Sequence, residues 1–189
     1  MRVHRWTDEA TRFNPATGAA RGRFHPFATA AGPVPVLYAG ATLRAAISET
    51  VFHDIPVRGE DRRVFRRRLI HYQASTLLPR RPLKLARLYS TGLRRLRVTR
   101  GELIETDAAH YDQTVAWGRA LHASPAQPDG LVWMSRQDDT TQALVLFGDR
   151  VLSGALTLDA REGIQPLGIG RGLDEVSAIA LESDITIVM

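Results

Sequence analysis

The chain has 189 residues, a length that suits one domain and allows a substantial core to be buried. Its 44% hydrophobic and 24% charged residues are typical of a folded protein, and no apolar run approaches the roughly 18 residues needed to span a bilayer. The absence of cysteine excludes a disulfide framework, a thiolate nucleophile and cysteine-ligated zinc. The first residues lack the apolar core of a secretion signal, so we expect a cytoplasmic protein without membrane contact.

The net charge of +5 comes from 25 Lys and Arg against 20 Asp and Glu, and Lys84 is the sole lysine. Guanidinium groups suit phosphates and carboxylates. Such a chain is compatible with nucleic acid, an acidic partner or a phosphorylated small molecule, and equally with a GC-rich genome. The charge therefore leaves the function open.

Glycines and prolines between residues 13 and 35 predict loops. The apolar run 34–39 predicts a buried strand, which Gly40 ends. Thr42 is a suitable N-cap for a helix over 43–53 whose apolar face packs on the sheet. Glu49 lies on the shoulder of that face, beside two alanines that leave room for a close approach.

Later segments predict further strands and helices. Strands are expected over 64–75, 83–88, 130–135, 143–147, 151–158 and 185–188, and helices over 110–122 and 173–181. Strands outnumber helices and do not alternate regularly with them. We therefore predict an α+β fold, a single domain with a mixed β-sheet core and flanking helices.

Several familiar sites are excluded by spacing. Glycines at every second position over 168–172 do not fit the dinucleotide-binding pattern and predict a turn. The six histidines are scattered and form no metal-ligand pattern, so no metal is expected. Ser135 does not lie in a hydrolase nucleophile motif, and no Walker A loop is present.

Five segments in order carry the remaining signal. They are His-Arg-Trp with Arg5, Arg-Gly-Arg-Phe with Arg23, Val-Leu-Tyr-Ala with Tyr38, Ala-Ile-Ser-Glu-Thr-Val-Phe-His with Glu49, and Gly-Leu-Val-Trp-Met-Ser with Ser135. Together they resemble the RES domain, a family named for its Arg, Glu and Ser. The resemblance covers most of the chain, and we predict one RES domain over 1–189.

Two positions depart from the family pattern. The family commonly has Asn-Pro after the second Arg and its aromatic, whereas this chain has His25 and Pro26 there. Trp133 stands where the family has Tyr. The Arg, Tyr and Glu positions are kept.

The resemblance implies a core similar to NAD-dependent ADP-ribosyltransferases. It implies cleavage of the bond between nicotinamide and ribose, with phosphate or water as acceptor. NAD+ is then a substrate, and no separate cofactor is expected. It further implies the toxin half of a toxin–antitoxin pair whose partner is an Xre-like antitoxin.

The chemistry of the matched residues suits such a substrate. Glu49 and Arg23 are the expected catalytic residues, and Arg5, Arg23, Tyr38 and Ser135 are expected to bind NAD+. Two guanidinium groups can grip a diphosphate, a tyrosine ring can stack on a base, and a carboxylate can stabilise positive charge on ribose. The loop containing Gly18, Gly22 and Gly32 would let backbone approach the ligand. Each residue also has a plain structural alternative, such as a salt bridge from Arg5 to Asp8.

Two other functions remain open. The same site could transfer ADP-ribose to a protein, and the arginine-rich strip over 62–68 could bind a partner or nucleic acid. We interpret the strip first as a solvated strand edge and next as a docking strip for an acidic antitoxin. Direct nucleic-acid binding without the antitoxin is not expected, because Phe65 is the strip's only base-stacking ring.

Overall fold

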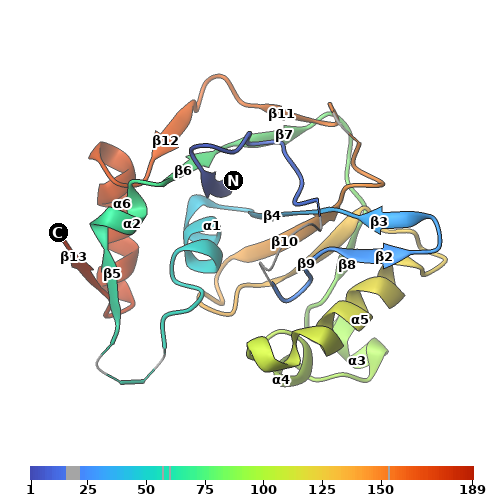
Figure 1. The fold of residues 1–189 in the computed structure, drawn as a ribbon. Helices are drawn as coiled ribbons and strands as arrows, with labels where there is room; N and C mark the ends of the chain where they lie inside the picture. The colour runs from blue at the N-terminus through green and yellow to red at the C-terminus, as the bar shows by residue number, and fades with distance from the viewer. Residues whose placement is uncertain (16–21, 57, 60, 153) are drawn as a thin grey trace.

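The computed structural model describes residues 1–15, 22–56, 58–59, 61–152 and 154–189, so Gly18 of the predicted ligand loop lies outside the described residues. The described chain is a mixed α+β domain with several small sheets and six α-helices (Figure 1). The predicted fold class is therefore confirmed.

A four-stranded sheet forms the centre of the domain. Its order is β4 (Val36–Gly40), β10 (Gln142–Phe147), β9 (Gly130–Met134) and β8 (Leu85–Arg87). The first two pairings are antiparallel, and β8 runs parallel to β9. All four strands fall within or beside the predicted apolar runs, because such runs are buried on both faces of a covered sheet.

A second sheet of three strands lies beside the first. Its order is β1 (Arg2–Arg5), β6 (Tyr72–Ser75) and β12 (Ile164–Pro166), and both pairings are antiparallel. Three pairs complete the strands: β2 (Phe27–Thr29) with β3 (Gly32–Val34), β7 (Leu77–Pro79) with β11 (Leu156–Leu158), and β5 (Arg63–Phe65) with β13 (Thr186–Val188).

The helices fall into two groups on either side of α1 (Leu43–Thr50). Figure 1 shows α3 (Ser90–Leu96), α4 (Arg100–Leu103) and α5 (Tyr111–His122) together at one end, with the turn η1 (Ala108–His110) leading into α5. The helices α2 (Arg66–Leu69) and α6 (Gly170–Glu182) lie at the other end, beside β5 and β13.

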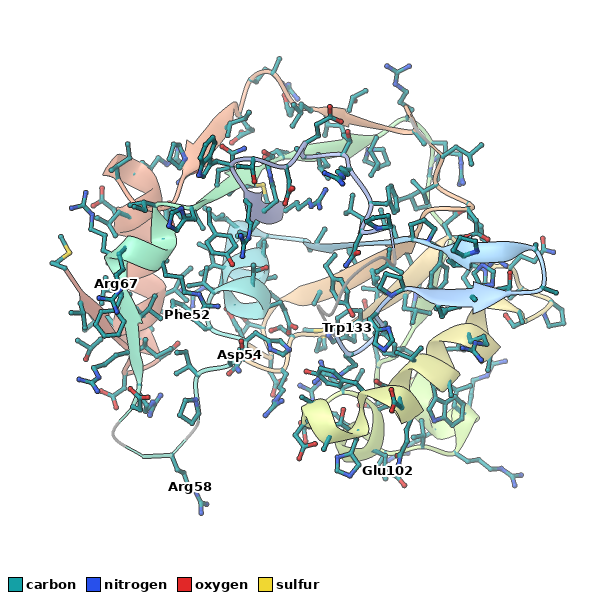
Figure 2. All side chains as sticks on the ribbon, viewed as in Figure 1. Phe52, Asp54, Arg58, Arg67, Glu102 and Trp133 are labelled. Atoms are coloured by element: carbon teal, nitrogen blue, oxygen red, sulfur yellow. The ribbon has the colours of Figure 1, made fainter. Side chains whose placement is uncertain are left out.

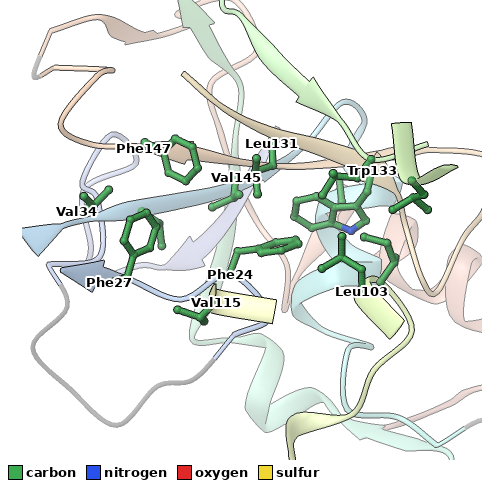
Figure 3. Packing of buried hydrophobic residues seen from close by; sticks show 14 residues of the cluster. Phe24, Phe27, Val34, Leu103, Val115, Leu131, Trp133, Val145 and Phe147 are labelled. Atoms are coloured by element: carbon green, nitrogen blue, oxygen red, sulfur yellow. The ribbon is translucent and has the colours of Figure 1, made fainter. Parts of the chain in front are cut away.

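Two main hydrophobic clusters match these groups. The first joins the central sheet to α3, α4 and α5 through residues such as Phe24, Leu103, Val115 and Trp133 (Figure 3). The second joins α1 and β6 to α6. Alternate residues of β4 and β10 face a third, smaller cluster on the opposite side of the sheet.

The predicted start of the α1 helix is confirmed. The Thr42 hydroxyl accepts a hydrogen bond from Ala45 N at 3.1 Å, as an N-cap does. The helix ends at Thr50 and is followed by turns, so it is shorter than the predicted span of 43–53.

Three predicted segments were wrong in part. The range 64–75 contains the helix α2 between two strands, and the range 151–158 is a strand only over Leu156–Leu158. The glycine run predicted as a turn enters α6, whose first residue is Gly170. Gly172 is required there because an added Cβ would lie 1.9 Å from Pro166 O.

Candidate functional site

A cavity of about 450 Å³ lies between α1, β1, β4 and the start of α5. This volume lies within the usual range of small-molecule sites. Its lining includes Arg2, Gly22, Arg23, Tyr38, Glu49, Thr50, His53, Asp54 and Tyr111. Three of the five predicted site residues, Arg23, Tyr38 and Glu49, therefore share one cavity.

The helix α1 carries Glu49 into this cavity because its first turn packs tightly on β4. A Cβ at Gly40 would lie 2.5 Å from Ala46 N and 2.7 Å from Ala45 Cβ, so glycine lets the helix come this close. One carboxylate oxygen of Glu49, Oε1, accepts hydrogen bonds from Ser135 Oγ at 2.7 Å and Arg136 N at 3.0 Å. Its Oε2 accepts no hydrogen bond from the described residues.

Ser135 lies behind Glu49 and does not line the cavity. It is fully buried, and its Oγ also accepts hydrogen bonds from the backbone N–H groups of Gln137 and Asp138, both at 3.2 Å. The hydroxyl thus fixes both the loop after β9 and the carboxylate. Ser135 therefore contacts the carboxylate of Glu49 and is not among the residues that line the cavity.

Arg23 is a buried cation facing Glu49, with only 2% of its surface exposed. Its Nη2 donates to Thr106 O at 3.1 Å, and its guanidinium carbon lies 5.8 Å from the Tyr111 ring centroid. Burial lowers the pKa of Arg23, and the negative charge of Glu49 partly opposes this. The guanidinium stays protonated at neutral pH, and its buried Nε has no hydrogen-bond partner in the described part of the chain.

Tyr38 is held rigidly in the wall of the cavity. Its hydroxyl accepts a hydrogen bond from Phe24 N at 2.6 Å, and its ring meets that of Trp133 edge-on at 6.1 Å. Burial raises the pKa of Tyr38, so the phenol is neutral and can act as a polar wall rather than a base. A Cβ at Gly22 would lie 3.2 Å from the Tyr38 hydroxyl, which explains a glycine there. Trp133 itself is fully buried and serves the core.

Arg5 lies outside this cavity, at the exposed end of β1. Arg2, three residues earlier on the same strand, lines it instead. The Nη1 of Arg2 donates to Ala10 O at 2.6 Å and Arg12 O at 2.7 Å, and burial lowers its pKa to about 10. The sequence offered no way to choose between the two arginines because the strand β1 was not predicted.

A second group of polar side chains in the cavity was also missed. His53 Nδ1 lies 2.9 Å from Asp54 Oδ1, and His53 Nε2 lies 3.2 Å from the Tyr111 hydroxyl. Figure 2 shows Asp54 just beyond the end of α1. Burial raises the pKa of Tyr111, and the charge of Arg23 opposes that rise. The spacing of His53 four residues after Glu49 was visible in the sequence, but Tyr111 comes from a distant helix.

The cavity combines charged groups of both signs with aromatic side chains. Two guanidinium groups line one cavity with two carboxylates, a histidine and two tyrosines. Among the described residues no group of three or more His, Asp or Glu could hold a metal ion, and no helix is long and apolar enough to cross a membrane.

The comparisons with known proteins identify the family. The model of the RES domain matches residues 1–161, so the chain belongs to the RES domain family. No curated protein and no solved structure matches the chain.

Proposed function

We propose that this RES domain protein cleaves the bond between nicotinamide and ribose in NAD+, with phosphate or water as acceptor. One observation carries the proposal most strongly. The Glu49 carboxylate, held by Ser135 and the Arg136 N–H, lines the same cavity as the buried Arg23. A fixed carboxylate and a buried cation in one cavity suit a substrate with a ribose and a diphosphate.

Arg23 is the proposed anchor for the diphosphate. Its guanidinium makes one hydrogen bond within the described chain, to Thr106 O, and so has further donors for a ligand. A charge with so little water around it interacts strongly with phosphate oxygens. Arg2 adds positive charge to the same cavity, although the Nη1 of its guanidinium is engaged by backbone carbonyls. Arg5 is left out of this proposal because it is exposed outside the cavity.

Glu49 is the proposed catalytic carboxylate. When the bond from ribose C1 to the nicotinamide nitrogen breaks, its electron pair neutralises the pyridinium ring and positive charge grows on the ribose. The free Oε2 of Glu49 can stabilise that charge or bind a ribose hydroxyl. The acceptor oxygen then bonds to C1, giving ADP-ribose 1-phosphate with phosphate, or ADP-ribose and a proton with water.

His53 is placed to serve the acceptor. With its Nδ1–H donated to Asp54, its Nε2 is a base that faces Tyr111 within the cavity. Such a base can take the proton that water or an acid phosphate loses on attack.

Residues beyond the family match pair with the matched part. The strand β12 pairs with β6, and β13 pairs with β5. We therefore propose that the single RES domain extends over 1–189. By its family, we further propose that the protein is the toxin of a toxin–antitoxin pair, held inactive in the cytoplasm by an Xre-like antitoxin.

The arginine strip gives less support to the noncatalytic alternative. Arg62 and Arg66 donate to the backbone of Ser183 and Gly168, and Arg67 lies over the Phe65 ring at 4.3 Å. These contacts use donors and the ring face that a nucleic acid would need. They favour the structural interpretation of the strip.

The test is incubation of the purified chain with NAD+, with and without phosphate, followed by mass spectrometry of the products. We expect free nicotinamide in both reactions. The reaction with phosphate should also give ADP-ribose 1-phosphate, and the reaction without phosphate should give ADP-ribose. Biotinylated NAD+ in a parallel reaction separates the alternative, because label on protein would indicate ADP-ribosyl transfer. Intact NAD+ after long incubation with the folded chain would refute the proposal.

A further inference from the structure

We propose that the free edge of β8 is a docking site for an extended, acidic segment of another protein. The strand β8 ends the central sheet, with β9 on one side and no strand on the other within the described chain. It lies at the same end of the molecule as α3 and α5 (Figure 1). This inference does not depend on cleavage of NAD+.

The backbone register of β8 leaves donors and acceptors unpaired. Lys84 O accepts a hydrogen bond from Asp129 N at 2.7 Å, and Leu88 N donates to Val132 O at 2.8 Å. Because alternate residues of a strand point their backbone groups to the same side, Leu85 and Arg87 point theirs away from β9. The Arg87 carbonyl is covered by α3, because a Cβ on Gly92 would lie 1.9 Å from Arg87 O. Outside the pairing of β8 with β9, the backbone of Leu85 and the N–H of Arg87 make no hydrogen bond with the described chain, and such edge groups readily pair with an added strand.

A groove of about 750 Å³ runs along this edge, between β8, α3 and the end of α5. Its apolar lining includes Leu85, Ala86, Leu88, Leu96 and Leu121. An added strand directs every second side chain to one face. The groove can therefore receive apolar side chains at alternate positions of a bound segment.

The charges around the groove select an acidic occupant. Its lining contains Lys84, Arg87 and Arg95 and no Asp or Glu, and these three cations form no ion pair in the described part of the chain. Other arginines are paired, for example Arg81 with Asp129 and Arg100 with Glu105. A second copy of this basic chain is a poor occupant because its net charge of +5 opposes association.

The first experiment uses a fluorescein-labelled, seven-residue peptide of alternating valine and glutamate. We expect saturable binding to the full chain by fluorescence anisotropy, and much weaker binding of the matching valine–lysine peptide. The adjacent arginines of α3 provide a matched pair, since Arg95 lines the groove and Arg94 is exposed but does not. We expect R95E to weaken binding about tenfold and R94E by less than about twofold.

Hydrogen exchange of the complex tests the register independently of any variant. The Leu85 and Arg87 amides should gain protection when the acidic peptide is bound, because the added strand pairs with them. Equal binding of the two peptides, equal losses in R94E and R95E, or unchanged exchange at these amides would each overturn the proposal. Tighter binding of a single-stranded DNA 12-mer that displaces the peptide would also overturn it, in favour of a nucleic-acid surface.

Discussion

The cavity at Glu49 and the groove beside β8 hold their charges in opposite ways. In the cavity the two central charges are held in place, with the buried Arg23 on Thr106 O and the half-buried Glu49 on Ser135. In the groove, apolar side chains make the floor and exposed, unpaired cations such as Arg95 surround it. Charges held in a fixed orientation suit the chemistry of one small molecule, whereas an exposed basic rim suits recognition of a chain.

Substitution of Glu49 should produce the largest difference between the two regions. Glu49→Gln keeps an acceptor for Ser135 and Arg136 N but removes the negative charge. We expect kcat/KM for NAD+ cleavage to fall about 100-fold or more, with thermal stability and acidic-peptide binding unchanged. The matched control is Glu162→Gln, at an exposed carboxylate away from the cavity, which should behave like the wild type. A wild-type rate in Glu49→Gln would remove this residue from the mechanism.

Ser135→Ala tests whether the buried hydroxyl positions the carboxylate. Loss of a hydrogen bond to a charged group, worth about 1.5–3 kcal/mol, predicts a fall in kcat of about tenfold or more with little change in KM. The backbone N–H groups of Gln137 and Asp138, which donate to the Ser135 hydroxyl, also lose their acceptor. The free energy of unfolding should therefore fall by about 1–3 kcal/mol. A lower stability with an unchanged kcat would indicate that Ser135 serves the loop alone.

Salt should separate the two regions without any substitution. Exposed charges are screened and buried charges much less so. Raising NaCl from about 0.05 M to about 0.5 M should weaken acidic-peptide binding about fivefold and change the KM for NAD+ by less than about twofold. Anisotropy titrations measure the peptide affinity, and initial rates at the same salt concentrations measure the KM for NAD+. An equal effect of salt on the two quantities would contradict the proposed difference between the regions.

A smaller effect is expected from the ion pair that anchors the start of β8. Asp129 accepts two hydrogen bonds from Arg81, at 2.7 and 2.8 Å, and one from Lys84 N at 2.8 Å. The hydrogen bonds from Arg81 hold the pKa of Asp129 below its ordinary value, so its contribution to stability is present at neutral pH and is lost as pH falls through that lowered pKa.

Asp129→Asn should therefore lower the melting temperature by about 2–4 °C at neutral pH. The difference in melting temperature between variant and wild type should become smaller when the pH is below the ordinary pKa of an aspartate. Thermal unfolding over a series of pH values measures it. A gap that is constant or widens in acid would show that the carboxylate charge does not contribute.

The resemblance and the local patterns predicted part of the site. The strand β4 with Tyr38, the N-cap Thr42 and the helix α1 with Glu49 follow one another directly along the chain. The structure brings Tyr38 and Glu49 into one cavity. The resemblance and the local patterns did not predict that Arg2, and not Arg5, lines that cavity. The side chains of β1 that face the cavity depend on how this strand pairs with β6, which lies about 70 residues further along the chain.

The α+β class, the strands of the central sheet and the family could all be predicted from local patterns, because apolar runs, caps and short motifs act over a few neighbouring residues. Three other features become visible only in the folded chain: Ser135 lies behind Glu49, His53 contacts Tyr111, and β8 is the last strand of its sheet. These arrangements arise from contacts between segments distant along the chain. They depend on how buried surfaces pack and which backbone groups find partners, and no local pattern encodes either.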